Sequence, residues 1–154
     1  THTGPRRGDV FMESSFAKQI ALLESGFIKG PIKVGNLNSL RTIADVRDAV
    51  RAYYLLLTSE PKPGGVYNIG GTHSMKVGEI LEYLISISKL SNIEYKVDST
   101  RLRPIDADLQ IPDMRKFQEK TGWKPKINYK KTLSDLLDYW RIKVLKNDGN
   151  FLIR

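Results

Sequence analysis

Three groups of arginine and acidic residues have the types and spacing to do chemistry in this sequence. The first is the turn GPRRGD at residues 4–9, which holds the guanidinium groups of Arg6 and Arg7 next to each other. The second is Arg41, which ends a loop that begins at Gly35. The third is the run RLRPID at residues 101–106, in which a proline stiffens the backbone between an arginine and a carboxylate. Guanidinium groups bind phosphate oxygens through paired, planar hydrogen bonds, so each group predicts an anion site.

Each of these groups also has a simpler structural explanation. The paired arginines of residues 4–9 could lie in an ordinary surface turn. Arg41 could instead form an ion pair with Asp45 or Asp48, which follow it closely in the sequence. An arginine of residues 101–106 could pair with Asp106 inside its own loop. Local spacing alone does not decide between these alternatives and an anion site.

Complete catalytic motifs are missing from the sequence. His2 and His73 have no Glu or Cys at metal-ligand spacing, so we expect no metal site, and His73 is expected in a turn. Tyr139 and Lys143 have the spacing of a Tyr-x-x-x-Lys acid–base pair, but they belong to a helix with an apolar face, and we interpret the spacing as coincidence. Neither Gly-x-Gly-x-x-Gly nor Gly-x-x-x-x-Gly-Lys occurs. No catalytic residue is therefore predicted within this chain.

Composition narrows the classes of protein that this chain can belong to. Its 154 residues include 25 Lys and Arg against 17 Asp and Glu, a formal net charge of +8, and no Cys. The lack of Cys excludes disulfides and thiol nucleophiles. No apolar run approaches the roughly 20 residues of a membrane helix, so we expect a cytoplasmic protein with no membrane partner. Seven Lys and Arg face two acids between Asp113 and Lys131, a stretch that suits either nucleic acid or a solvated surface.

Hydrophobic spacing predicts an α/β arrangement of helices and short strands. Helices are expected at about residues 13–25, 45–58, 77–89, 113–120 and 132–146, and strands at about 32–37, 66–69 and 93–97. Three or four strands are few for a complete doubly wound sheet. Together with the missing glycine-rich loop, this predicts a nucleotide-binding fold that is incomplete within the chain.

Four short motifs occur in an order that carries a resemblance. They are Gly-Asn-Leu-x-x-x-Arg at residues 35–41, Asn-Ile-Gly-Gly at 68–71, Arg-Pro-x-Asp at 103–106 and Thr-Gly-Trp-x-Pro at 121–125. In this order the chain, up to about Lys146, resembles the C-terminal half of extended short-chain dehydrogenase/reductases that act on nucleotide sugars. Within that superfamily it is most similar to GDP-mannose 4,6-dehydratases and the related GDP-sugar 4-keto reductases.

The resemblance implies a substrate-binding half of an enzyme. Residues 1–154 would form this C-terminal part, and about 41–71 would contribute the last helix and strand of an incomplete Rossmann sheet. The cofactor fingerprint and the catalytic Tyr-x-x-x-Lys of the family lie upstream of the matched segment. The chain alone is therefore expected to be an inactive fragment, and its first residue, which is not Met, agrees with that expectation.

Matching the motifs residue by residue assigns a substrate site to this chain. Arg41 is similar to the arginine that grips the diphosphate of the nucleotide sugar. Arg103 and Asp106 match the pair that embraces the phosphate and the nucleotide end. Met12 and Ser15 occupy positions that line the nucleotide pocket.

Two further positions concern the cofactor and a departure from the family. Arg7 matches a loop that lies near cofactor and subunit contacts in GDP-mannose dehydratases. Thr1 stands where the family has an Asn that contacts substrate, so that contact loses its support here. The full-length enzyme would use NADP or NAD and would be a homo-oligomer, a dimer or a tetramer.

The implied reaction converts a GDP-sugar into a 4-keto-6-deoxy sugar nucleotide by an internal exchange of hydride with the cofactor. A GDP-4-keto-6-deoxy-sugar reductase or another nucleotide-sugar epimerase would use the same half unchanged. Two alternatives come from other classes: a basic module that binds nucleic acid through Lys116 to Lys131, which we favour less, and an α/β domain with no ligand.

Overall fold

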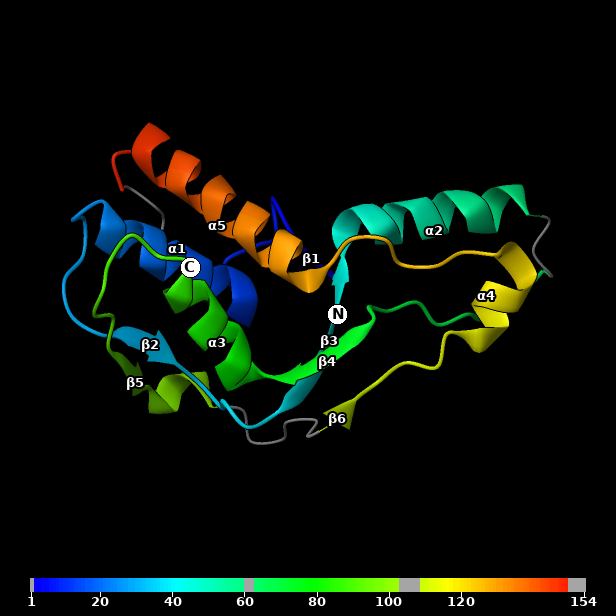
Figure 1. The fold of residues 1–154 in the computed structure, drawn as a ribbon, viewed down its shortest axis with the longest axis horizontal. Helices are drawn as coiled ribbons and strands as arrows, with labels where there is room; N and C mark the ends of the chain where they lie inside the picture. The colour runs from blue at the N-terminus through cyan, green and yellow to red at the C-terminus, as the bar shows by residue number, and fades with distance from the viewer. Residues whose placement is uncertain (1, 60–62, 103–108, 150–154) are drawn as a thin grey trace.

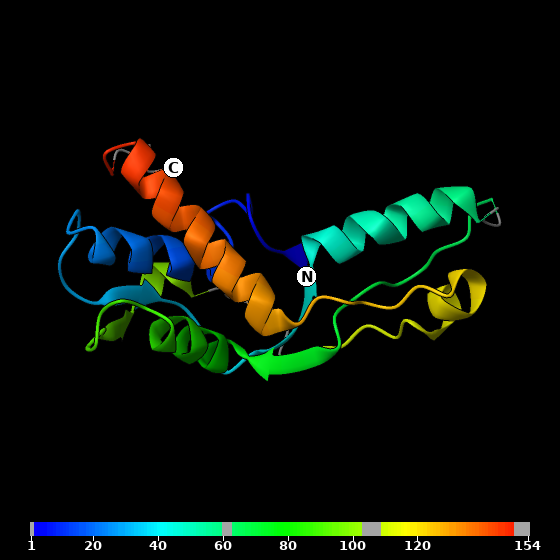
Figure 2. The ribbon, with the colours of Figure 1, turned by 45° about the horizontal axis from the view of Figure 1, so that its top comes forward.

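The computed structural model describes residues 2–59, 63–102 and 109–149. In chain order its elements are β1 (His2–Thr3), α1 (Met12–Glu24), β2 (Ile32–Val34), β3 (Leu40–Asp45), α2 (Val46–Thr58), β4 (His73–Lys76), α3 (Val77–Ser86), β5 (Tyr95–Val97), the short 3-10 helix η1 (Ser99–Arg101), β6 (Leu109–Gln110), α4 (Arg115–Thr121) and α5 (Tyr129–Lys146). The molecule is elongated, with α2 and α4 lying apart from the other helices (Figure 1). A second view shows the same separation (Figure 2).

Strand β3 is the centre of the sheet. It pairs with β4 in the antiparallel sense, and β1 and β6 pair with it in the parallel sense. Leu40 lies opposite Lys76 on β4 and opposite Leu109 on β6, while Ala44 lies opposite His2 on β1. Strands β2 and β5 form a separate parallel pair. The sheet therefore joins segments that lie far apart in the sequence, from His2–Thr3 to Leu109–Gln110, at one strand.

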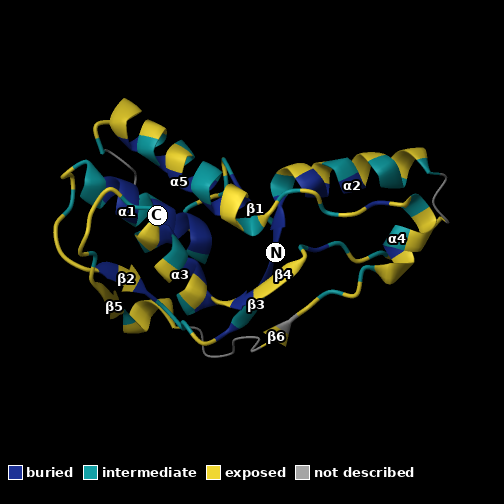
Figure 3. Cartoon of the chain, in the orientation of Figure 1, coloured by how far each residue is buried: buried dark blue, intermediate teal, exposed yellow. Residues whose placement is uncertain are grey.

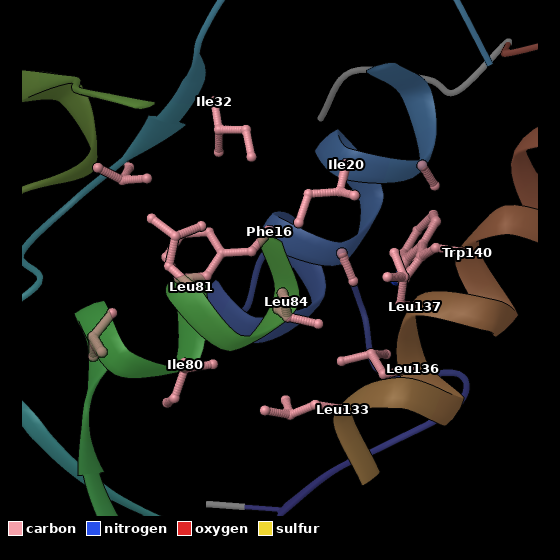
Figure 4. Packing of buried hydrophobic residues seen from close by; sticks show 14 of the residues in the cluster. Phe16, Ile20, Ile32, Ile80, Leu81, Leu84, Leu133, Leu136, Leu137 and Trp140 are labelled. Atoms are coloured by element: carbon pink, nitrogen blue, oxygen red, sulfur yellow. The ribbon is translucent and has the colours of Figure 1, made fainter. Parts of the chain in front are cut away.

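Helices α1, α3 and α5, together with β2 and β5, form what we call the large lobe. Side chains from the three helices meet in its core, as Figure 4 shows. The largest buried apolar side chains there are Phe16, Ile20, Ile32, Ile80, Leu81, Leu84, Leu133, Leu136, Leu137 and Trp140. Burial of apolar area on this scale is the main stabilising contribution to the fold.

Helices α2 and α4, with the segment 66–69 between them, form what we call the small lobe. Its core is limited to Ala52, Phe117 and Trp123, against which several half-buried side chains pack. Figure 3 shows that buried residues are concentrated in the large lobe and that α2 carries many exposed positions. The small lobe thus depends on few apolar contacts of its own.

The five predicted helices are confirmed, with small shifts of their ends; the last begins at Tyr129 because Asn128 caps it by accepting from the N–H of Lys130. The prediction was wrong about several strands. His73 lies in β4 rather than in a turn, and Arg41 lies in β3 rather than in a loop. Polar residues enter these strands because they find partners across the sheet, as Thr42 and Ser74 do with hydroxyl oxygens 2.8 Å apart.

Two other expectations also fail. Residues 66–69 are not assigned as a strand, and Val66 is 78% exposed. The apolar spacing of residues 45–58 also predicts that Val50, Tyr53 and Leu57 face inward on the helix. In the structure they are exposed and form a stripe with Tyr54 on one side of α2. The apolar spacing correctly predicted a helix, but this face is exposed apart from the contact of Tyr53 with His2.

Candidate functional site

The first turn of α1 is the place where three arginine-bearing segments come together. Arg101 of η1 donates a hydrogen bond from Nη1 to the Oγ of Ser15 at 3.0 Å. Arg7, in the turn before the helix, stacks its guanidinium group 3.3 Å from the ring centre of Phe11. Burial raises the pKa of the Glu13 carboxyl group, and the positive charges of Arg7 and Arg41 act on that group and oppose part of the rise. Three positive groups therefore converge on a helix N-terminus, which itself favours anions.

Met12 and Ser15, both predicted to line a nucleotide pocket, lie in this first turn. Ser15 is buried, and its Oγ accepts hydrogen bonds from Arg101 and from the side-chain amide of Gln19. Met12 is half-buried and packs against the edge of the large core. The structure thus brings Ser15 directly to an arginine and places Met12 at the boundary of the lobe.

Arg41 extends from the β3 strand at the centre of the sheet. Its Nη1 donates to the carbonyl oxygen of Leu40 at 2.9 Å, and its backbone lies opposite Met75 on β4. The carboxylates of Asp45 and Asp48, its suggested partners, pair with Arg47 and Arg51.

Gly35 explains how the Gly-Asn-Leu-x-x-x-Arg motif meets the RLRPID run. A Cβ atom at Gly35 would lie 2.7 Å from the carbonyl oxygen of Arg101, so only glycine allows this approach. Asn36 then donates to the Oγ of Ser39 at 2.9 Å, which closes the loop before β3. The motif therefore brings the chain that carries Arg101 to the start of the strand that carries Arg41.

Arg103 and Asp106 lie outside the described residues. The residues that flank them approach the site from two sides. Arg101 is bonded to Ser15, and β6 pairs with β3 at Leu40 and Arg41.

Glu13 is the residue at this site that sequence reasoning missed. Its side chain is 1% exposed, and its Oε1 has no hydrogen-bond partner in the described structure. Burial raises the pKa of Glu13 above its ordinary value, although the guanidinium groups of Arg7 and Arg41 partly oppose that shift. An acid in a first helical turn is usually explained by its favourable interaction with the helix dipole. The sequence therefore showed no sign that this glutamate is buried.

The Thr-Gly-Trp-x-Pro motif serves the small lobe rather than this site. Gly122 ends α4 in the left-handed conformation, with φ of 66°. Trp123 is then buried against Phe117, and its Nε1 donates to the carbonyl oxygen of Asp48 at 3.2 Å. The motif thus ties α4 to α2.

Two basic residues of the region 113–131 are engaged within the fold. Lys116 donates to the carbonyl oxygen of Val66 at 2.8 Å, and Lys131 pairs with Asp135. On α5, the ammonium group of Lys143 lies over the ring of Trp140, 4.6 Å from its centre. These contacts are typical of basic side chains that cover a protein surface.

A search of the described ranges 2–59, 63–102 and 109–149 finds no set of three or more His, Asp or Glu residues placed to share a metal ion. Within the same ranges, no helix has both the length and the apolar character needed to cross a membrane.

Comparison with known proteins adds to this geometry. A family model described as GDP-mannose 4,6 dehydratase matches residues 1–136. GDP-6-deoxy-D-mannose reductase from Pseudomonas aeruginosa is 32% identical over 143 residues, which cover 93% of this chain and 46% of that protein. GDP-mannose 4,6 dehydratase 1 from Arabidopsis thaliana is 28% identical over 138 residues, covering 89% of this chain and 37% of that protein. The chain therefore spans less than half the length of these relatives.

Solved structures show the same correspondence. The structure of RMD from Pseudomonas aeruginosa complexed with NADPH superposes with a TM-score of 0.84 at 30% identity, over 94% of this chain and 47% of that one. UDP-glucuronic acid 4-epimerase from Bacillus cereus, in complex with UDP-glucuronic acid and NAD, superposes with a TM-score of 0.80 at 21% identity, over 93% of this chain and 43% of that one. The second likeness shows a shared fold.

Proposed function

Because the chain belongs to the GDP-mannose 4,6-dehydratase family, we propose that it is the substrate-binding part of an NAD(P)-dependent enzyme acting on GDP-sugars. The observation that carries this proposal is the convergence of Arg7, Arg41 and Arg101 at the start of α1. A diphosphate is the anion that suits several guanidinium groups beside a helix N-terminus.

The proposed roles follow from the match of these residues to the motifs of the family. Arg41 binds the diphosphate from the β3 side, and Arg103 and Asp106 complete the grip on the phosphate and the nucleotide. Ser15 and Met12 line the nucleotide pocket, with Ser15 fixed by Arg101. All of these residues position the substrate so that its sugar ring meets the reactive part of the enzyme.

Arg7 is the residue of this chain that we propose to contact the cofactor. Its Nε atom is buried and has no hydrogen-bond partner in the described structure, so it fits an acceptor group that comes from outside these residues. A bound nicotinamide cofactor supplies hydride exchange with the sugar. The contribution of Arg7 is to fix a polar group of that cofactor beside the substrate site.

The small lobe supports a two-part enzyme. The relatives are about twice as long as this chain. The stripe Val50, Tyr53, Tyr54 and Leu57 is 52–80% exposed, an apolar face suited to burial against another part of a protein. We propose that about residues 41–71 join the Rossmann domain of the whole enzyme, whose other half covers this stripe and carries the catalytic residues.

Two reactions remain candidates for the whole enzyme. A 4,6-dehydratase agrees with the family model. A GDP-4-keto-6-deoxy-sugar reductase is favoured by the higher identity to the Pseudomonas reductase, 32% against 28% for the Arabidopsis dehydratase. Incubation of the complete gene product with GDP-mannose and NADP, or with the 4-keto sugar nucleotide and NADPH, separates the two by the product in mass spectrometry.

Calorimetry on the complete gene product tests the binding site. Arg103→Ala should weaken binding of GDP-mannose by about 1.5–3 kcal/mol, the scale of a charged hydrogen bond. Lys146→Ala, on the distant end of α5, is the control and should leave the affinity unchanged. Unchanged affinity in the Arg103 variant would refute its role. An oligonucleotide that binds in a salt-dependent way, with no binding of GDP-mannose, would replace the proposal by nucleic-acid binding.

A further inference from the structure

Glu13 and Arg7 present two buried polar atoms that nothing in the described structure satisfies. The Oε1 of Glu13 and the Nε of Arg7 both lack a hydrogen-bond partner there. The Glu13 side chain is 1% exposed, so water reaches it poorly. Buried polar atoms are almost always hydrogen-bonded in folded proteins, and two neighbouring exceptions point to a ligand.

Several contacts hold Arg7 beside the first turn of α1, the turn that carries Glu13. Arg7 stacks on the ring of Phe11, directly before α1. Its carbonyl oxygen accepts a hydrogen bond from Ser14 Oγ at 2.7 Å, and Trp140 Nε1 donates to that same Oγ at 2.8 Å. The turn that carries Arg7 is thus anchored to α5 and to the residue next to Glu13.

The chemistry of the pair selects one kind of ligand group. A guanidinium N–H can only donate a hydrogen bond, while a carboxylate oxygen accepts one. A hydroxyl group can accept from the first and donate to the second at the same time. A phosphate group placed between Arg7 Nε and Glu13 Oε1 would satisfy Arg7 but would face the carboxylate of Glu13 unfavourably, so the diphosphate belongs on the Arg41 side of the site and not between these two groups.

We propose that Glu13 and Arg7 together bind a hydroxyl group of a sugar ring, so that Glu13 is a specificity-determining residue beside the diphosphate site. The inference rests on the proposed function, because that function brings sugar rings to this place. Two sources offer the same chemistry: the hexose of the GDP-sugar and a ribose of the nicotinamide cofactor. The ligand series below distinguishes them.

The test is binding of GDP, GDP-mannose and NADPH to the complete gene product and to its Glu13→Gln variant, by calorimetry. The glutamine keeps the shape of the side chain but removes the carboxylate. We expect about a tenfold or greater loss, the scale of a hydrogen bond to a charged group. A loss for GDP-mannose without one for GDP identifies the hexose; a loss for NADPH alone identifies the cofactor ribose.

Two controls keep the result interpretable. Glu24→Gln changes another buried glutamate, whose carboxylate is already bonded to Arg141, and should leave all three affinities unchanged in the folded protein. Arg7→Lys keeps the charge but removes the Nε donor, and its effect should be non-additive with that of Glu13→Gln. Additive effects would mean that the two groups do not share a ligand group, and would overturn the proposal.

The remaining outcomes are equally decisive. Unchanged affinity for every ligand in Glu13→Gln, or an equal loss for all three, overturns the hydroxyl site while leaving the proposed function in place. Failure of the unaltered protein to bind GDP-mannose overturns both.

Discussion

The first turns of α1 and α2 each bury a carboxylate, and the two carboxylates differ in their hydrogen bonding. At the start of α2, Asp48 is 2% exposed. Its carboxylate accepts hydrogen bonds from the backbone N–H groups of Lys126 and Ile127 and from the guanidinium group of Arg51. At the start of α1, Glu13 is equally buried, yet its Oε1 has no partner in the described structure.

The difference separates a structural carboxylate from one that is available for a ligand. Both groups lie in a first helical turn, so the helix dipole favours both and does not explain the contrast. The bonds of Asp48 join α2 to the segment that leads into α5, and they stabilise the arrangement of the two lobes. Glu13 stabilises no described contact through Oε1, and its burial therefore lowers stability unless a partner binds.

The largest expected effect is that of removing the satisfied carboxylate. Asp48→Ala should lower the free energy of unfolding by about 3 kcal/mol, because it leaves two backbone N–H groups and a guanidinium group without their acceptor. Urea unfolding measures the change. Asp113→Ala, which removes an exposed carboxylate bonded to the backbone and side chain of Arg115, is the control and should lower the free energy of unfolding by much less. Equal effects of the two substitutions would contradict the structural role of the Asp48 carboxylate.

Removing the hydrogen bond between Trp140 and Ser14, the residue next to Glu13, should lower the free energy of unfolding by less. Trp140→Phe deletes the hydrogen bond to Ser14 Oγ and part of a buried side chain, and should lower the free energy of unfolding by about 2 kcal/mol. If this bond positions the turn of Arg7, ligand affinity should also fall in calorimetry. Ile142→Ala, at a 57% exposed position two residues further along α5, should change neither quantity.

Changing the unsatisfied carboxylate should have an effect of opposite sign. Glu13→Gln should raise the free energy of unfolding of the ligand-free protein by about 1 kcal/mol, because an amide is easier to bury than a carboxylate. Thermal unfolding without ligand measures this change. Glu24→Gln should instead destabilise the protein, because its carboxylate is bonded to Arg141. If both variants are destabilised, the Glu13 carboxylate stabilises the fold as Glu24 does, and the contrast with Asp48 is wrong.

The stabilisation expected from Glu13→Gln should depend on pH, and this is the smallest of the expected effects. Burial raises the pKa of Glu13 in the folded state. Below the ordinary pKa of about 4.3, Glu13 is protonated in both the folded and the unfolded state, and the fold keeps its full stability. As the pH rises toward the folded-state pKa, the unfolded state ionises first, so the free energy of unfolding falls. The stability difference between Glu13→Gln and the unaltered protein should be near zero at the acid end and should grow with pH. A difference independent of pH would contradict the raised pKa.

Asp45 provides the opposite pH response in the same experiment. Burial by itself would raise its pKa, but hydrogen bonds from Arg47 and Thr132 outweigh that effect and lower it. Its stabilisation is present above the ordinary pKa of about 3.9 and is lost as the pH falls through the lower folded-state value. Asp45→Asn should therefore be destabilising near neutral pH and should lose its effect at strongly acid pH. Destabilisation that persists there would indicate a packing defect instead.

The sequence by itself determined the helices and the family. Apolar residues such as Leu133, Leu136 and Trp140 recur at helical spacing on α5, and this local pattern survives in the fold because the same face is buried. Four motifs in the family's order indicated the GDP-mannose 4,6-dehydratase family, and the family match over residues 1–136 confirmed that membership. The arginines of the site were also visible as residue types suited to a phosphate.

Only the tertiary structure decided which polar groups are buried and what they meet. Arg41 was expected in a loop, but it lies in strand β3, because that segment pairs with three other strands of the chain. Arg101 reaches Ser15 across 86 positions of sequence, and Glu13 is enclosed by elements that local spacing does not connect. Burial and hydrogen bonding depend on contacts between distant segments, whereas helical periodicity depends on near neighbours. That is why the sequence predicted the helices of this protein but not its unsatisfied carboxylate.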